Sequence, residues 1–215
     1  GGRGQFTIEF SHYDELPEVE PATMTWAWRA GFNVPRHKPA RFSDLRGIPK
    51  EWVGESATVF AIERFDRRPD GTRVHHEDLC QALGLRPSRK YGDEQPGVRF
   101  EGAFRLVRDA CGDDDAREMA RRLGFMIACG NTDAHLKNWG LLWGDRVRPT
   151  LVPCYDLVST ISWEQLGWPQ RGGPRLALRW GTTHRFADLD PGQIEAFASG
   201  CACPWAKDEV LAGIA

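Results

Sequence analysis

The residues of this chain best suited to chemistry are an acid, an amide and a second acid in a fixed order. Asp133 and Asn138 stand five residues apart, and Asp156 follows Asp133 by 23 residues at the end of a strand-like run. Oxygen atoms of carboxylates and amides are the ligands that Mg²⁺ prefers, and a carboxylate beside a hydroxyl group can accept its proton. These residue types at this spacing indicate metal-assisted phosphoryl transfer.

The segment between the two acids is predicted to be a β-hairpin that positions them. Residues 139–143 form one strand, Gly144-Asp145 the turn, and residues 147–152 the second strand. This order is the layout of a protein kinase, in which the loop Asp receives the hydroxyl proton and the Asn and later Asp hold the metal. The alternative is that Asp133 and Asp156 cap a turn and a helix and that Asn138 is an ordinary loop residue.

Composition excludes several classes of protein. With 215 residues, of which 41% are hydrophobic, the chain can bury the core of one large or two small domains. The formal net charge of -2 gives no global basic field for nucleic acid. We see no apolar stretch of membrane-spanning length and no signal-peptide core in the first thirty residues. The six cysteines are scattered, which suits reduced thiols, so we expect a cytoplasmic protein.

The first third of the chain is predicted to contain strands and one helix. Residues 5–10 alternate as a short strand, and an acidic loop over residues 14–20 precedes a helix that begins at Pro21 and ends near Ala30. Met24, Ala27 and Trp28 would share the buried face, with Gly31 as the stop. A further strand begins at Val34, a loop contains Gly47, Pro49 and Gly54, residues 57–65 form a buried strand, and residues 66–71 form a turn.

The remainder is predicted to be mostly helical. A short helix is predicted over residues 77–83 and ends at Gly84, and a longer helix covers residues 100–111. The longest helix follows a cluster of three acids that begins at Asp113. A strand over residues 176–180 and a helix begun by Asp190 follow. We therefore predict an α+β chain with the two lobes of a protein kinase. Residues 1–66 would be a partial N-terminal lobe on the nucleotide side, and residues 67–215 a helical C-terminal catalytic lobe.

Five stretches, spread in order along the chain, resemble the HipA-like serine/threonine kinases of bacterial toxin–antitoxin systems. They are residues 62–67 (IERFDR), 76–81 (HEDLCQ), 87–91 (PSRKY), 131–138 (NTDAHLKN) and 153–156 (PCYD). Such an ordered set is more specific than any single motif. The resemblance covers residues 5 to about 200.

The resemblance implies roles for the loop that contains Asp133. Asp133 would be the catalytic base, and Asn138 and Asp156 would be the Mg²⁺ ligands. His135 would lie beside the nucleotide phosphates, or be a structural loop histidine. Lys137 would neutralise the transferred phosphoryl group, or face solvent.

The resemblance also implies how ATP is held. Residues Glu63 to Phe65 would be the hinge that gives main-chain hydrogen bonds to adenine, and Asp66 would lie near the ribose. The alternatives are that Glu63 and Arg64 form a surface ion pair and that Phe65 belongs to the core.

The chain departs from the family at its amino end. Family members are about twice as long and carry a glycine-containing phosphate loop, for which there is no room before the first strand. In the family, a lysine on the first strand pairs with the phosphates and with an acid from the nearby helix. Here Glu9 stands at the position of that lysine and Glu20 would be the acid, so the two carboxylates would repel each other. We therefore expect a truncated or partial member, and Arg3 is the nearest cation that could substitute.

Three functions remain open from the sequence. The first is a HipA-like kinase that uses ATP and Mg²⁺ to phosphorylate a protein hydroxyl, with an aminoacyl-tRNA synthetase as one possible substrate. A HipB-like helix-turn-helix antitoxin would be its partner and would provide the only link to DNA. The second is an aminoglycoside- or choline-kinase-type enzyme, because Asp133, His135 and Asn138 also fit its D-x-H-x-x-N loop. The third is an inactive kinase-like binding module, which Glu9 favours.

Overall fold

The structure is a computed structural model that describes residues 6–9, 16–41, 58–92, 98–144, 147–162 and 173–215. The chain divides into two compact units. The first unit comprises Gly1–Val74 and Pro153–Val158, and the second comprises His75–Val152 and Ser159–Ala215. The first break lies eight residues beyond the predicted lobe boundary, and Asp156 belongs to the first unit. That these units are the two lobes of a kinase stays a prediction.

The described strands of the first unit form one antiparallel sheet with β3 in its centre. β3 (Thr58–Glu63) pairs with β1 (Phe6–Glu9) on one side and with β2 (His37–Arg41) on the other. The side chains of residues 59–62 in β3 are all buried, as expected for a central strand. The predicted strand at residues 57–65 is therefore confirmed with shorter ends. The predicted strand at Val34 begins later, at His37, and this edge strand includes Pro39 opposite Phe60.

Helix α1 (Leu16–Arg29) begins five residues before the predicted start at Pro21. Pro21 lies in its second turn, where its fixed φ suits the helix and its missing N–H removes one main-chain hydrogen bond. Met24 and Ala27 are buried as predicted, but Trp28 is 62% exposed, because the buried stripe continues towards Glu20 instead. Gly31 ends the helix as predicted, with φ of 89° and its N–H donating to the carbonyl of Trp28.

The turn after β3 is confirmed by main-chain hydrogen bonds across residues 68–72. The predicted loop with Gly47, Pro49 and Gly54 lies outside the described residues. Within the first unit, Met24, Phe60 and Ile62 form a small buried cluster, against which Tyr155 and Leu157 pack. The segment that carries Asp156 is thus part of the core of this unit.

The second unit contains an antiparallel sheet of β4 (His75–Asp78), β5 (Gly140–Trp143) and β6 (Thr150–Leu151). The predicted hairpin is confirmed, since Leu141 of β5 lies opposite Leu151 of β6. The predicted helix at residues 77–83 is shorter: α2 spans Leu79–Ala82, because Asp78 ends β4 and caps the helix through the main-chain N–H of Gln81. Gly84 follows it with φ of 66°, as predicted.

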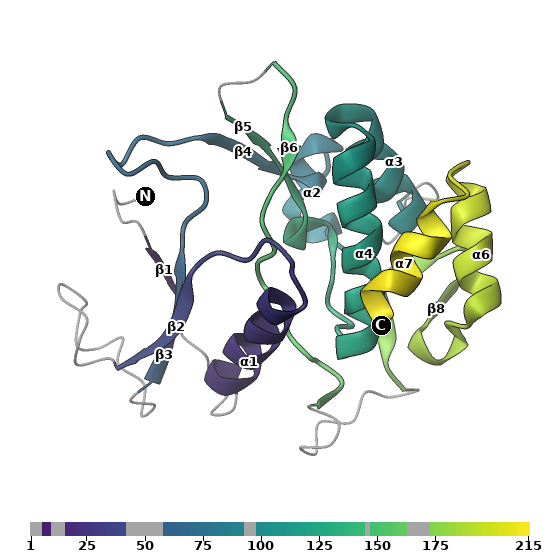
Figure 1. Ribbon diagram of the computed structural model, residues 1–215, viewed down its shortest axis with the longest axis horizontal. Helices are drawn as coiled ribbons and strands as arrows, with labels where there is room; N and C mark the ends of the chain where they lie inside the picture. Colours follow the sequence, from purple (N-terminus) through teal and green to yellow (C-terminus); the bar gives the residue numbers. More distant parts are fainter. Residues whose placement is uncertain (1–5, 10–15, 42–57, 93–97, 145–146, 163–172) are drawn as a thin grey trace. The chain divides into compact units, whose positions relative to one another are not determined.

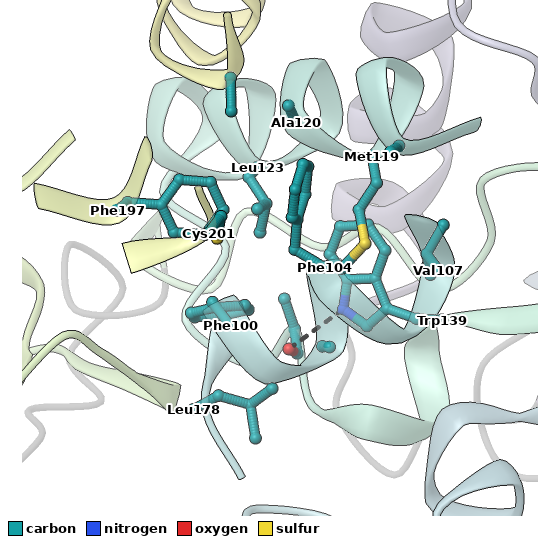
Figure 2. Close-up of a cluster of buried hydrophobic side chains, with 14 of the residues drawn as sticks. Phe100, Phe104, Val107, Met119, Ala120, Leu123, Trp139, Leu178, Phe197 and Cys201 are labelled. Carbon is teal, nitrogen blue, oxygen red and sulfur yellow. Dashed lines mark hydrogen bonds between the residues drawn. The ribbon is translucent and has the colours of Figure 1, made fainter. Parts of the chain in front are cut away.

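Four longer helices build the core of the second unit. They are α3 (Phe100–Cys111), α4 (Asp113–Cys129), α6 (Pro191–Gly200) and α7 (Ala206–Ile214); Figure 1 shows α4 with α3 and α7 beside it. Figure 2 shows their apolar side chains meeting around Phe104, with Met119 and Leu123 of α4 and Phe197 of α6. Each such fully buried side chain contributes about 1.5–3 kcal/mol to stability. This core fixes the end of α4, from which the Asp133 loop departs.

The predicted α+β class is confirmed by this mixture of helices and strands. A two-stranded sheet of β7 (Arg175–Trp180) and β8 (Thr183–Arg185) completes the described strands, and Asp190 caps α6 as predicted. All six cysteines are free thiols. Within the described ranges, no helix combines the length and the apolar character needed to cross a membrane.

Candidate active site

The Asp133 loop (residues 130–138) begins where α4 ends in a left-handed glycine. Gly130 has φ of 66°, and a Cβ atom there would lie 2.3 Å from the side chain of Ile161, so no other residue fits without movement. The next residue, Asn131, is buried and its Oδ1 accepts the main-chain N–H of Asp133 at 2.9 Å. The turn that presents Asp133 is therefore fixed by a buried amide.

A pair of buried threonines ties this loop to the segment that follows Asp156. The Thr160 hydroxyl accepts the main-chain N–H of Thr132 at 2.7 Å, lies 2.7 Å from the Thr132 hydroxyl, and donates to the carbonyl of Gly130 at 3.1 Å. Buried hydrogen bonds of this kind are costly to break, because each orphaned group keeps its desolvation penalty. The loop is thus anchored at Gly130 and at Thr132.

Asn138 closes the loop back onto Asp133. Its Nδ2 donates to the main-chain carbonyl of Asp133 at 3.0 Å, and its own N–H donates to the carbonyl of His135 at 2.9 Å. The amide is thereby oriented, and its buried Oδ1 has no hydrogen-bond partner among the described residues. A buried amide oxygen left in this way is suited to a cation, since Mg²⁺ takes oxygen ligands.

The carboxylate of Asp133 is accessible, with 50% of its side chain exposed. Its Oδ1 accepts the hydroxyl of Tyr91 at 3.1 Å, and Oδ2 lies 4.0 Å from Nε2 of His135. An exposed carboxylate held at one oxygen has the other available for a substrate hydroxyl. This arrangement suits a general base.

His135 is buried beside the carboxylate. Its Nε2 lies 2.7 Å from Nζ of Lys90, and its ring forms a T-shaped contact with the ring of Tyr91. Burial lowers the pKa of the His135 imidazole, and the positive charges of Lys90 and Lys137 lower it further, while Asp133 opposes them. The ring is therefore neutral near pH 7 and offers one N–H donor.

Lys137 is held by an acid from outside the loop. Its Nζ donates to Oδ2 of Asp78 at 2.8 Å, with 39% of the lysine side chain exposed and 9% of the aspartate. Asp78 is the residue that caps α2, so one carboxylate serves both the helix and the loop. The side chain of Lys137 is thus partly exposed and paired with an acid at the same time. Its contact with the transferred phosphoryl group stays a prediction.

The first unit holds the other four predicted residues. Glu63 forms a bidentate ion pair with Arg36 at 2.8 Å, and its main-chain N–H donates to the Arg36 carbonyl. The hydrogen bonds from Arg36 lower the pKa of Glu63. Glu63 therefore pairs with Arg36 and not with Arg64, which was the predicted alternative.

Asp66 is engaged by two guanidinium groups. Arg64 binds both of its oxygens at 2.7–2.8 Å, and Arg67, almost fully buried, binds Oδ2 at 2.6 Å. Burial would raise the pKa of Asp66, but the two arginines outweigh it, so the pKa is lowered and the carboxylate is charged at neutral pH. The phenyl ring of Phe65 is half-buried, 5.4 Å from the ring of Tyr155.

Asp156 stands in an unusual backbone conformation. Its φ is 55°, in the left-handed region that few residues other than glycine adopt and that Asp and Asn tolerate best. Two residues earlier, the N–H of Cys154 donates to the carbonyl of Asn33 at 2.7 Å, which fixes the approach to it. Such conformations cluster at functional sites.

The two acids predicted to repel each other are only partly described. Glu9 lies in β1 opposite Phe60, and its side chain is outside the described part of the structure. Glu20 is a buried acid in α1. Their repulsion stays a prediction.

Several residues that position the loop were missed from the sequence. They are Asp78, Lys90, Tyr91 and Thr160, and Arg122 was missed as a residue that holds the segment after β6. Lys90 and Tyr91 stood in a recognised stretch but had no role, while Arg122, buried in α4, donates to the carbonyl of Val152 at 2.6 Å. A charged residue on the apolar face of the longest helix was the signal for Arg122. Nothing local indicates the pairing of Thr132 with Thr160.

The second unit thus brings Asp133, His135, Lys137 and Asn138 together in one loop, and the first unit carries Glu63, Phe65, Asp66 and Asp156. Within the described ranges, no group of three or more His, Cys, Asp or Glu side chains could hold a metal ion by itself. A site with an amide ligand such as Asn138 is not among the His, Cys, Asp and Glu groups just considered.

Comparison with known proteins gives one consistent family. Residues 4–212 match the family model described as HipA-like C-terminal domain. The chain is 35% identical to "Putative kinase Y4dM" of Sinorhizobium fredii over 204 residues, which are 93% of this chain and 46% of that protein. It is 32% identical to "Serine/threonine-protein kinase toxin HipA" of Shewanella oneidensis over 174 residues, 73% of this chain and 37% of that protein.

A solved structure agrees. A chain of the Shewanella oneidensis complex titled as toxin–antitoxin system HipA, HipB and its operator DNA superposes with a TM-score of 0.77 and 26% identity. The match covers 98% of this chain and 48% of that one. The chain therefore spans less than half of the length of these relatives.

Proposed function

Because this chain belongs to the HipA-like C-terminal domain family, as its sequence predicted, we propose that it carries the catalytic residues of a serine/threonine protein kinase. The reaction is transfer of the γ-phosphate of ATP to a protein hydroxyl. The observation that carries this proposal is the geometry of Asn138. Its amide is oriented by the Asp133 carbonyl so that a buried oxygen without a described partner lies in the loop of the candidate base.

Asp133 acts as the base in this proposal. Its half-exposed carboxylate accepts the proton of the attacking hydroxyl, while Tyr91 holds the other oxygen. Proton transfer by a positioned side chain contributes about 10²- to 10⁴-fold to the rate. Positioning of the hydroxyl supplies further acceleration.

Asn138 fits a magnesium ion, and we propose it as one ligand, with Asp156 as the second. Mg²⁺ bound to ATP neutralises the charge that develops on the phosphates. Asp156 is ionisable and stands in a strained backbone position, which is the kind of feature found at such sites. His135 supplies an N–H donor to a phosphate oxygen, and Lys137 supplies positive charge near the transferred group.

For the nucleotide, we propose that Glu63 to Phe65 form the hinge and that Asp66 lies near the ribose. The N–H of Glu63 already donates to Arg36, so the adenine contact uses another main-chain group of this stretch. Asp66 is held charged and fixed by Arg64 and Arg67, which supports a positioned acceptor for ribose hydroxyls. The Phe65 ring, beside Tyr155, gives an apolar surface for a base.

By the likeness to the Shewanella complex, we propose a HipB-like antitoxin as partner, with DNA bound only through it. The substrate is a protein, for which an aminoacyl-tRNA synthetase is the first candidate to test. These partners and substrates belong to whole proteins about twice as long as the matched region.

The proposal is tested by incubating the protein with γ-labelled ATP and Mg²⁺ and offering two acceptors. Transfer to a serine or threonine peptide and not to an aminoglycoside supports the protein kinase. The reverse result supports a small-molecule phosphotransferase, which the Asp133, His135 and Asn138 spacing also fits. No transfer, and no rise of melting temperature in millimolar Mg-ATP, would indicate an inert binding module.

Replacement of Asp156 tests the second metal ligand. Asp156→Asn keeps a residue that tolerates positive φ but removes one ionic ligand, so the backbone should persist while metal binding weakens. We expect Kd for Mg-ATP to rise about tenfold and phosphotransfer to fall at least as much. Calorimetric titration with Mg-ATP, beside the rate, measures both. Equal phosphotransfer by wild type and variant would reject the assignment.

A further inference from the structure

Two residues without an assigned role, Lys90 and Tyr91, hold the side chains of the Asp133 loop. The Tyr91 hydroxyl donates to Oδ1 of Asp133 at 3.1 Å, and Nζ of Lys90 lies 2.7 Å from Nε2 of His135. The main chain joins them as well, since the N–H of Leu136 donates to the carbonyl of Lys90 at 3.1 Å. Three separate hydrogen bonds therefore connect two consecutive residues to the candidate catalytic loop.

The local fold makes this pair rigid. The short helix η3 (Pro87–Arg89) leads directly into Lys90, whose N–H donates to the carbonyl of Pro87. Gly92 follows with φ of 69°, and a Cβ atom there would lie 2.6 Å from the Val98 side chain. The Lys90 ammonium also lies 4.8 Å from the centre of the Tyr91 ring. The two side chains thus support each other from a fixed turn.

The contact between Lys90 and His135 determines which ring nitrogen carries the proton. An ammonium group has no lone pair and only donates, so Nε2 of His135 accepts and the hydrogen resides on Nδ1. His135 is 6% exposed at its side chain, and its Nδ1 has no hydrogen-bond partner among the described residues. A buried N–H in this situation is suited to an anionic oxygen.

We propose that Lys90 and Tyr91 are positioning residues for the phosphotransfer reaction. Tyr91 fixes the carboxylate of Asp133 for the acceptor hydroxyl, and Lys90 fixes His135 as the Nδ1–H tautomer, which donates to a phosphate oxygen of the nucleotide. This inference rests on the proposed function for its chemical purpose. The contacts themselves are testable in the resting protein.

The first test does not require activity. In protein labelled with ¹⁵N at histidine, nitrogen chemical shifts identify the protonated ring nitrogen of His135, which is assigned by comparison with His135→Asn. We expect Nδ1–H in wild type at neutral pH and a mixture of both tautomers in Lys90→Met. Arg86→Met removes an exposed cation from the same turn and should leave the tautomer unchanged. An Nε2–H form in wild type, or no response to Lys90→Met, would overturn the inference for Lys90.

The second test separates positioning from folding. Tyr91→Phe keeps the ring that meets His135 and removes only the hydroxyl. We expect kcat to fall about 10- to 100-fold, with KM for ATP within about twofold, because the base is misplaced while nucleotide contacts remain. A purely structural role would lower the folded fraction and leave kcat per folded molecule unchanged, and that result would overturn the inference for Tyr91.

The two tests also distinguish this inference from the proposed function. A wild-type protein without phosphotransfer contradicts the proposed function. Even then, the measured tautomer of His135 shows whether Lys90 determines which ring nitrogen carries the proton. Phosphotransfer with normal kcat in Tyr91→Phe supports the proposed function and rejects the positioning role of Tyr91.

Discussion

Asp133→Asn is expected to lower kcat for phosphotransfer by about 10²- to 10⁴-fold, with Kd for Mg-ATP within about threefold of wild type. The substitution removes the only proton acceptor of the loop that faces solvent as a carboxylate. The amide oxygen can still accept the Tyr91 hydroxyl, and the main-chain bonds to Asn131 and Asn138 do not involve the side chain of residue 133. Loop structure and nucleotide binding should therefore survive the loss of the base.

Initial rates with γ-labelled ATP give kcat, and calorimetric titration with Mg-ATP gives Kd. Asp109→Asn is the matched control, because it makes the same charge change at a side chain that is 73% exposed on α3. Its rate should stay within about twofold of wild type. A rate for Asp133→Asn close to that of Asp109→Asn would show that another group receives the hydroxyl proton.

The elements that local patterns specify were predicted well from the sequence. Helix α3 has the bounds predicted for it, and the hairpin of β5 and β6 was predicted from two apolar runs and a Gly-Asp turn. Gly31 and Gly84 both close helices with positive φ. Each of these features depends on residues close together in the chain, so residue propensities and the spacing of apolar residues are enough to predict it.

The errors lie where distant residues decide the structure. Glu77 and Asp78, the second half of strand β4, were assigned to a helix, because the pairing of β4 with β5 involves residues more than sixty positions away. Trp28 was placed in the core from its spacing alone, whereas the buried stripe of α1 is set by what packs against it. The contacts of Lys90 and Tyr91 with His135 and Asp133 also join distant positions. Sequence spacing therefore found the residues suited to chemistry but not those that position them.

Gly124→Ala and Gly213→Ala are each expected to destabilise the protein, against the usual preference of helices for alanine. A Cβ atom at Gly124 of α4 would lie 2.0 Å from the carbonyl oxygen of Val210, and one at Gly213 of α7 would lie 1.9 Å from that of Arg121. Alanine gains about 1 kcal/mol of helix propensity over glycine. Forcing two helix backbones apart loses packing along the whole contact, and overpacking costs about 1–3 kcal/mol or more.

We therefore expect a net loss of about 2 kcal/mol in the free energy of unfolding for each variant, measured by urea denaturation followed by circular dichroism. Gly200→Ala is the matched control. It also lies in a helix of the second unit, but its Cβ would meet Glu101 at an ordinary 3.7 Å. The control should be neutral or slightly stabilising, because only the propensity gain applies there. Stabilisation by Gly124→Ala of the same size as by Gly200→Ala would mean that α4 and α7 do not touch through their backbones.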